Sequence, residues 1–253
     1  MIDSRERFSD RVEDYVRCRP SYPPELITAL LEDSIDSAVL RAADIGSGTG
    51  IFTRLLLERG LTVSGVEPNT NMRRAAENDL QSFEKFTSVE GSAEDTGLAD
   101  ASLDLVTAAQ AFHWFHNSRA RMEFARILKP QGRLALVWNR RRLSDPFQKS
   151  YDALLREFAP EYDKVNHLTL GDDEIGEFFE AGRMTLSCFD NRQRLEFEGL
   201  LGRLRSSSYC PATDSSEYAA LVAELERLFA DHATGGVIRF AYDSHLYLGP
   251  VAR

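Results

Sequence analysis

The stretch Ala42-Ala43-Asp44-Ile45-Gly46-Ser47-Gly48-Thr49-Gly50 decides the fold that this sequence predicts. An apolar run leads directly into three alternating glycines, and residues 52–59 have the composition of a helix. Glycines let the backbone turn tightly and approach a ligand closely, while the amide groups at the start of a helix attract an electron-rich ligand. The pattern therefore predicts a strand, a ligand-binding turn and a helix.

The chain continues with the same alternation of strands and helices. We expect strands at residues 39–45, 62–66, 86–89, 103–108, 133–138, 183–197 and 237–248, the last one broken near Tyr242-Asp243. We expect helices at residues 5–17, 24–32, 52–59, 71–80, 118–128 and 217–230, with further helical structure across 145–182. Lys129-Pro130-Gln131-Gly132 predicts a turn, and Arg19-Pro20-Ser21-Tyr22-Pro23 predicts a fixed bend. These elements predict an α/β fold, a Rossmann-like doubly wound sheet of seven mostly parallel strands with helices on both faces and a helical cap insertion.

Composition limits the partners of this chain. Its 253 residues carry a formal net charge of −10, from 40 acidic and 30 basic residues, and such a surface repels the phosphate backbone of nucleic acids. The densest basic run, Asn139 to Arg142 with Arg133 nearby, predicts a solvated face, the usual environment of short charge runs. We therefore expect no nucleic acid partner.

Cysteine usage and hydropathy indicate the compartment. Cys18, Cys188 and Cys210 are far apart and show no spacing typical of metal ligands, so we expect neither a metal site nor a disulfide framework. Residues 1–11 are strongly charged, and no apolar run approaches the roughly 20 residues that a membrane span requires. The expectation is a cytoplasmic protein without a membrane partner.

Acidic residues beside the glycine-rich turn indicate the kind of cofactor. Glu67, in Val66-Glu67-Pro68, follows the next expected strand and can accept hydrogen bonds from both hydroxyls of a ribose. Asp44 precedes the turn, where it would repel a pyrophosphate but suits the ammonium group of an amino acid. The third glycine is also placed differently from the G-x-G-x-x-G pattern of NAD sites. A nucleoside cofactor with an amino acid tail is favoured, with an NAD-dependent oxidoreductase as the alternative.

At this point the sequence resembles the class I S-adenosylmethionine-dependent methyltransferases, specifically their small-molecule branch, the methyltransferase type 11 and trans-aconitate methyltransferase-like enzymes. Residues 44–50 look like the first motif of that family, Glu67 its ribose-binding acid, Gly91-Ser92-Ala93-Glu94-Asp95 its adenine loop, and residues 103–115 its fourth strand with the following loop. In the family the adenine loop often has Asp where this chain has Ser92. The carboxy-terminal hairpin commonly carries Thr where this chain has Ser244-His245.

The resemblance implies S-adenosylmethionine as the cofactor, S-adenosylhomocysteine as its product, and a cofactor site spread over several segments. The implied cofactor-binding residues are Tyr15, Arg19, Asp44, Gly46, Ser47, Gly48, Gly50, Glu67, Pro68, Ser92, Ala93, Glu94, Gln110 and Ala111. It also implies one methyltransferase domain over 1–253, with cofactor-covering helices at 1–35, a cofactor-binding core at 36–140, substrate-cap insertions at 145–182 and 200–216, and the rest of the sheet at 183–199 and 217–253.

The loop after the fourth expected strand is the candidate acceptor site, because ligands bind at the carboxyl ends of the strands in open α/β sheets. We expect Tyr22, Phe112, His113 and Trp114 to line a pocket for a small-molecule methyl acceptor. Methyl transfer from a sulfonium is an in-line SN2 displacement that mainly needs alignment and exclusion of water. An acceptor that must lose a proton would use His113 as general base, with a rate that rises through an apparent pKa near about 6.5. A non-catalytic S-adenosylmethionine-binding protein is a second alternative, and we expect a monomer or a homodimer.

Overall fold

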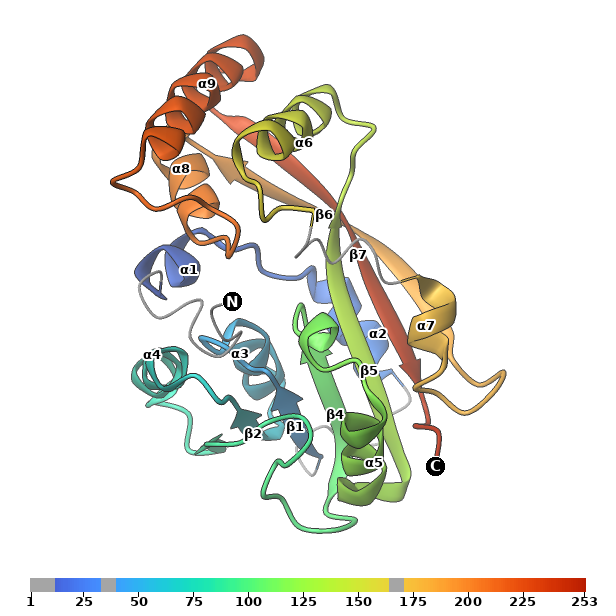
Figure 1. The fold of residues 1–253 in the computed structure, drawn as a ribbon. Helices are drawn as coiled ribbons and strands as arrows, with labels where there is room; N and C mark the ends of the chain where they lie inside the picture. The colour runs from blue at the N-terminus through green and yellow to red at the C-terminus, as the bar shows by residue number, and fades with distance from the viewer. Residues whose placement is uncertain (1–11, 33–39, 164–170) are drawn as a thin grey trace.

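One seven-stranded sheet organises the chain in a computed structural model that describes residues 12–32, 40–163 and 171–253 (Figure 1). The strands are β1 (Arg41–Ile45), β2 (Thr62–Val66), β3 (Phe86–Val89), β4 (Leu103–Ala109), β5 (Leu128–Arg141), β6 (Thr185–Leu195) and β7 (Ile238–Gly249). Their order across the sheet is β3-β2-β1-β4-β5-β7-β6, and only β7 pairs antiparallel with its neighbours. The predicted doubly wound, mostly parallel sheet of seven strands is confirmed.

Helices cover both faces of this sheet. The helices described are α1 (Val12–Cys18), α2 (Pro24–Leu31), α3 (Ile51–Glu58), α4 (Thr70–Leu80), α5 (Ser118–Ile127), α6 (Pro146–Phe158), α7 (Asp172–Gly176), α8 (Phe197–Arg205) and α9 (Ser216–His232), with the 3-10 turn η2 at Phe112–Trp114. Helices α2, α3 and α4 pack on one face and α5 and α7 on the other. Alternation along β5 sends Ala135 and Val137 to the first face and Leu134 and Leu136 to the second.

Side-chain caps set where two of these helices begin. The Asn69 side chain accepts hydrogen bonds from the backbone N–H groups of Asn71 and Met72 at the start of α4. Asn117 does the same for the first turn of α5. Such caps satisfy donors that have no partner within the helix, so the loops after β2 and before α5 lead into their helices at a fixed angle. Both loops lie at the edge of the sheet where the candidate site is found.

A third apolar cluster supports the cap, which we define as α6, α8 and α9 with the described residues 159–163 and 206–215. It packs these helices on Leu195, Ile238, Phe240 and Tyr242 of β6 and β7 (Figure 1). The sequence assigned residues 217–253 to the sheet, but α9 within that range packs against α6 and belongs to the cap. Helix α1 lies against α8, so the amino-terminal segment also touches the cap.

A predicted turn before one strand and a predicted break within another are both wrong. The expected turn at Lys129–Gly132 lies inside β5: Leu103 pairs with Leu128 and Leu105 with Arg133, so the extra residues form a bulge. The expected break near Tyr242-Asp243 does not occur either, because β7 is paired on both sides there. At Tyr242-Asp243 the ladder bonds from β5 and β6 outweigh the turn preference of an isolated segment.

The amino-terminal helix is described only from Val12 and ends at Cys18, one residue beyond the expected end. Helix α1 spans Val12–Cys18, whereas the sequence predicted a helix over 5–17, of which residues 5–11 lie outside the described part. Strand β1 begins at Arg41 rather than at residue 39, which also lies outside it. Within the described ranges no helix is long and apolar enough to cross a bilayer.

Candidate cofactor and acceptor site

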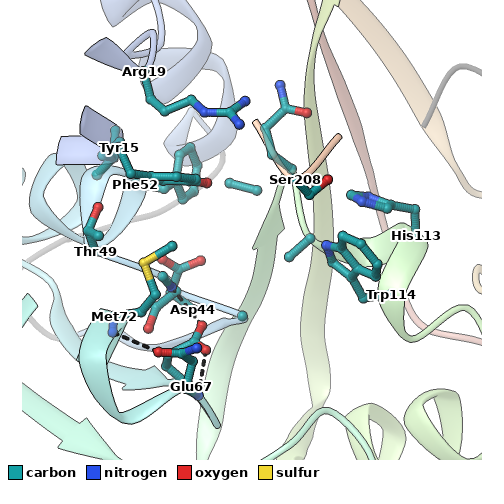
Figure 2. A pocket seen from close by; sticks show the side chains of 18 of the residues that line it. Tyr15, Arg19, Asp44, Thr49, Phe52, Glu67, Met72, His113, Trp114 and Ser208 are labelled. Atoms are coloured by element: carbon teal, nitrogen blue, oxygen red, sulfur yellow. Dashed lines mark hydrogen bonds between the residues drawn. The ribbon is translucent and has the colours of Figure 1, made fainter. Parts of the chain in front are cut away.

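A single cavity at the carboxyl ends of β1, β2, β4 and β5 brings together segments that are far apart in the sequence (Figure 2). Nearly all of the predicted site residues line it: Tyr15, Arg19, Tyr22, Asp44, Gly46, Ser47, Gly48, Glu67, Pro68, Ser92, Ala93, Glu94, Gln110, Ala111, His113 and Trp114. His113 and Trp114 lie across the pocket from Asp44 and Glu67 in Figure 2. The structure thus joins the candidate cofactor residues and the candidate acceptor loop.

The glycine-rich turn shapes one wall of this cavity. Gly46 and Gly48 have φ angles of 66° and 57°, a left-handed conformation that favours glycine. A Cβ on Gly46 would lie 2.7 Å from the Cβ of Ala111, whereas a Cβ on Gly48 would meet no atom within 4 Å. The space over Gly48 is therefore open for a ligand to approach the backbone.

Gly50, expected to bind the cofactor, does not line the cavity. It has a φ of 84° at the start of α3, and a Cβ there would lie 2.8 Å from Leu80 Cδ1 of α4. Its small size therefore lets α3 begin close to α4. The prediction that Gly50 contacts the cofactor is wrong, because the third glycine faces the core.

Glu67 connects the turn after β1 to the end of β2. Its Oε2 accepts a hydrogen bond from the Gly48 N–H at 2.9 Å, and its Oε1 accepts one from the Asn69 N–H at 2.8 Å (Figure 2). Burial raises the pKa of Glu67, which is only 8% exposed, and the two backbone donors oppose that effect. Each carboxylate oxygen keeps a second lone pair, so Glu67 can accept further hydrogen bonds from ligand hydroxyls.

Asp44 is a buried carboxylate at the end of β1. The hydroxyls of Thr53 and Thr107 donate hydrogen bonds to it at 2.7 Å and 2.9 Å. Burial raises the pKa of Asp44 to about 6, and the nearby negative charge of Glu67 acts in the same direction. No cationic side chain among the described residues pairs with Asp44, so this end of the cavity favours a positively charged ligand group.

The expected adenine loop is held by its own backbone and by a neighbouring helix cap. The backbone groups of Ser92 and Asp95 exchange hydrogen bonds. Glu94 Oε1 accepts a hydrogen bond from Asn117 Nδ2 at 2.8 Å. Burial raises the pKa of Glu94, but the hydrogen bonds from Asn117, Ser92 and the backbone, together with the positive charge of Arg119, outweigh it, so the net pKa is below its ordinary value. Glu94 stays ionised at neutral pH and is available as an acceptor at the cavity wall.

The amino-terminal segment contributes a guanidinium to the cavity. Arg19 lies over the Tyr15 ring, 4.9 Å from its centroid, and its Nη2 donates to the Ser206 carbonyl oxygen at 2.8 Å. Its Nε is buried without a partner. Tyr22 packs edge-on against Phe52, with ring centroids 5.1 Å apart. These contacts attach the segment after α1 to both the cap and the cofactor side.

The loop after β4 differs from expectation at two residues. Phe112 is fully buried between Phe115, Trp138 and Phe178 and does not line the cavity, so its assignment to the acceptor pocket is wrong. His113 does line it, but burial, assisted by the positive charge of Arg19, lowers its pKa to about 4. This pKa lies well below the 6.5 expected for His113 as a general base, and that role stays a prediction.

Several further cavity residues were not among the site residues named from the sequence. They are Asn139, Arg141, Tyr162, Arg203, Ser208, Tyr209 and Tyr242, although Tyr162, Arg203, Ser208 and Tyr209 lie in the expected cap ranges 145–182 and 200–216. The run Asn139 to Arg142 was expected to be solvated, but Asn139 and Arg141 are buried at the end of β5. Arg140 and Arg142 conform better, because both form ion pairs with partly exposed aspartates. The sequence signal for this part of the cavity is the run of four polar residues, Asn139 to Arg142, at the end of an apolar strand.

Comparisons with known proteins agree with this geometry. Residues 43–136 match a family described as "Methyltransferase domain". The chain is 45% identical over 134 residues to an uncharacterized methyltransferase of Mycobacterium tuberculosis, a match that covers 53% of this chain and 52% of that protein. It is 28% identical over 225 residues to an uncharacterized methyltransferase-like protein of Schizosaccharomyces pombe, covering 87% and 85%. The chain thus spans about half the length of the first curated relatives it matches.

A solved structure shows the same fold. A protein of Anaeromyxobacter dehalogenans described as a type II methyltransferase superposes with a TM-score of 0.64 at 24% identity, covering 92% of this chain and 97% of that one. The matching region, residues 43–136, contains the glycine-rich turn, Glu67 and the adenine loop that line the cavity. With the fold, the motif geometry and these matches in agreement, the chain contains a methyltransferase domain and is similar to the class I S-adenosylmethionine-dependent methyltransferases, whose cofactor is S-adenosylmethionine.

Proposed function

We propose that this chain transfers a methyl group from S-adenosylmethionine to a small-molecule acceptor by in-line SN2 displacement. The observation that carries the proposal is that one continuous cavity is lined both by the family motif residues and by residues of the loop after β4 and of the cap. A methyl donor and its acceptor must share one enclosed space for direct transfer. The net charge of −10 supports a small molecule over a nucleic acid as acceptor.

The residues at the cavity wall fit the parts of this cofactor. Glu67 would accept hydrogen bonds from the ribose hydroxyls, and Asp44 would face the ammonium group. Arg19, with an unpartnered buried Nε, would bind the carboxylate of the amino acid tail. Ser92, Ala93 and Glu94 would border the adenine. The open space over Gly48 leaves room for the ligand against the turn.

When bound, S-adenosylmethionine supplies a methyl group activated by its positively charged sulfur. The chain's own contribution is to hold the acceptor in line and to exclude water. Tyr22, Phe52 and Trp114 are the aromatic wall residues suited to exclude water. His113 is neutral at physiological pH because its pKa is lowered to about 4, so we assign it a hydrogen-bonding, positioning role toward the acceptor.

The test of the proposal combines binding and turnover. Isothermal titration should show binding of S-adenosylmethionine and S-adenosylhomocysteine but not of NAD, which separates a methyltransferase from an oxidoreductase. Incubation with methyl-labelled cofactor and a metabolite extract should then give a labelled product together with S-adenosylhomocysteine. Cofactor binding without any labelled product would favour the non-catalytic alternative. The cytoplasmic location and the monomeric or dimeric state stay predictions.

A further inference from the structure

Buried arginines line the part of the cavity that belongs to β5 and the cap. Arg141 ends β5 and Arg203 lies in α8, and both line the cavity together with Tyr242. Asp44 and Glu67 follow β1 and β2, and three strand spacings, about 14 Å, separate β2 from β5 in the sheet order. The cavity is therefore acidic on the cofactor side and basic on the cap side.

We propose that the methyl acceptor carries an anionic group, a carboxylate or a phosphate, and that Arg203 and Arg141 bind it. This inference rests on the function proposed above, because it takes the acidic side of the cavity as the cofactor site.

Arg203 is the first support, because it is a buried cation that has no anionic partner among the described residues. It is 5% exposed, and its guanidinium carbon lies 4.4 Å from the centroid of the Phe240 ring. Its Nε donates to the Tyr242 hydroxyl at 2.9 Å, while Nη1 is buried and has no acceptor. Within the described ranges no carboxylate forms an ion pair with it. Removing such a charge from water is costly unless an anion compensates for it, so a ligand anion in the cavity would complete this environment.

Arg141 is the second support. Its Nη2 donates to Asp152 Oδ1 at 2.9 Å and contacts the Tyr162 hydroxyl, but its Nη1 is buried and has no acceptor. Asp152 also accepts a hydrogen bond from Arg156 Nε at 2.9 Å, so one carboxylate serves two guanidinium groups. The charge of Arg141 is therefore only partly compensated by the chain.

Tyr242 contacts both arginines. It pairs with Arg141 in the ladder between β5 and β7, and its hydroxyl accepts the hydrogen bond from Arg203 Nε. A planar guanidinium that is fixed by packing and whose Nη1 has no acceptor among the described residues suits a carboxylate or phosphate better than a single neutral oxygen. The cofactor's own carboxylate does not meet this need, because Arg19 on the amino-terminal segment is assigned to it.

The experiment measures anion binding to the full chain saturated with S-adenosylhomocysteine, so that the cofactor's carboxylate site is already filled. Acetate, succinate, benzoate and inorganic phosphate are compared with acetamide, succinamide and benzamide by titration calorimetry and thermal shift. At least one anion should bind and its neutral amide should not. The affinity for phosphate, compared with the affinities for the carboxylates, shows which of the two anionic groups the site binds. Arg203→Met should weaken that anion about tenfold or more while S-adenosylhomocysteine affinity stays within about twofold.

A matched control is Arg227→Met, which removes an arginine that is 73% exposed on α9. It should leave anion binding unchanged. The inference is overturned if no anion binds better than its neutral amide. It is also overturned if Arg203→Met and Arg227→Met bind the anion equally well, because Arg203 would then only support the packing of the cap. If Arg203→Met does not fold, the same test is made with Arg203→Lys and with the comparison of anions and amides in the wild type. If the wild type does not bind S-adenosylhomocysteine, the proposed function itself is contradicted.

Discussion

At the scale of single residues, burial changes the chemistry of the groups that the motif supplies. Asp44 and His113 both line the cavity, and burial shifts the pKa of the acid upward and that of the imidazole downward, each toward its neutral form. A cationic ligand would reverse this effect for Asp44, because the positive charge stabilises the carboxylate. The site thus stores an unfavourable charge that the cofactor can relieve.

We therefore predict that Asp44→Asn stabilises the free protein but weakens the cofactor. The pKa of Asp44 is raised from 3.8 to about 6, so the folded state binds its proton more tightly than the unfolded state. The stability from this group is present below pH 3.8 and is lost as the pH rises through about 6. At about pH 8 the variant should gain about 1 to 3 kcal/mol of unfolding free energy and bind S-adenosylmethionine at least about tenfold more weakly.

Urea unfolding at several pH values and titration calorimetry measure the two effects. The gain in stability should shrink toward pH 4, where Asp44 is already protonated in the folded protein. Thr53→Val is the matched control, since it removes a hydrogen bond to the same carboxylate but leaves the charge. An Asp44→Asn protein with unchanged cofactor affinity would remove Asp44 from the cofactor site.

Glu67→Ala should weaken cofactor binding by about 1.5 to 3 kcal/mol, the range for hydrogen bonds to a charged group. Glu67 also accepts the N–H groups of Gly48 and Asn69, so we expect an additional loss of about 1 kcal/mol in stability. Glu67→Gln, which keeps an acceptor, should be milder in both respects. Calorimetry with S-adenosylhomocysteine and thermal unfolding check this, and an unaltered dissociation constant for Glu67→Ala would exclude a ribose contact.

His113→Gln tests how the acceptor is handled. Since its pKa is about 4, His113 is neutral from mildly acidic pH upward, and the wild-type rate should show no limb near pH 6.5 from this group. A neutral His113 that only positions the acceptor removes no proton, so the rate constant kcat should fall less than about tenfold, with a comparable change in KM. His116→Gln, in the same loop but outside the cavity, is the control. A fall of about 10² or more with a limb near 6.5 in the wild type would restore the general-base hypothesis.

At the scale of elements, the turn between β1 and α3 separates binding from folding within a few residues. Gly48 faces open space at the cavity, while Gly50 faces Leu80 of α4. Both have positive φ angles, so alanine costs backbone strain at either position. The difference between the two sites lies in what a methyl group would meet.

Gly50→Ala should destabilise the protein by about 1 to 3 kcal/mol, because it adds a contact of 2.8 Å with Leu80 to the backbone strain. Gly48→Ala should destabilise it by about 1 kcal/mol from strain alone but should lose most of its S-adenosylhomocysteine affinity, since the methyl group enters the ligand's space. Each variant serves as the control for the other in urea unfolding and calorimetry. Equal cofactor affinities in the two variants would contradict the assignment of Gly48 to the cavity wall.

Element-level patterns explain which parts of the site could be predicted. The turn, Glu67 and the adenine loop each follow a strand in a short local pattern, and the sheet order brings these ends together. Arg141 and Arg203 could not be found this way, because their environment depends on β7 and α8 packing against them. The Tyr242 hydroxyl accepts a hydrogen bond from Arg203, which lies 39 residues away in the sequence. Arg19 donates one to the carbonyl oxygen of Ser206, which lies 187 residues away. No local spacing encodes such contacts.

At the scale of the whole molecule, the cavity joins three regions of the chain. The amino-terminal segment supplies Arg19, the sheet supplies Asp44 and Glu67, and the cap supplies Arg203. The cap has its own apolar cluster, distinct from the two clusters on the faces of the sheet. A ligand that contacts all three regions should therefore stabilise the folded chain more than a ligand that contacts only one of them.

The final prediction is that S-adenosylhomocysteine raises the melting temperature and that NAD does not. A ligand that binds only the folded state stabilises it by mass action, by about 2.7 kcal/mol at a concentration one hundred times its dissociation constant, which we expect to be micromolar. Its amino acid tail would join Arg19 to Asp44, so limited proteolysis of the segment after α1 should also slow down. Arg19→Gln should keep binding adenosine but lose about tenfold in affinity for S-adenosylhomocysteine, because only the latter carries a carboxylate. Stabilisation by NAD alone, or an equal loss for both ligands, would contradict this orientation of the cofactor along the cavity.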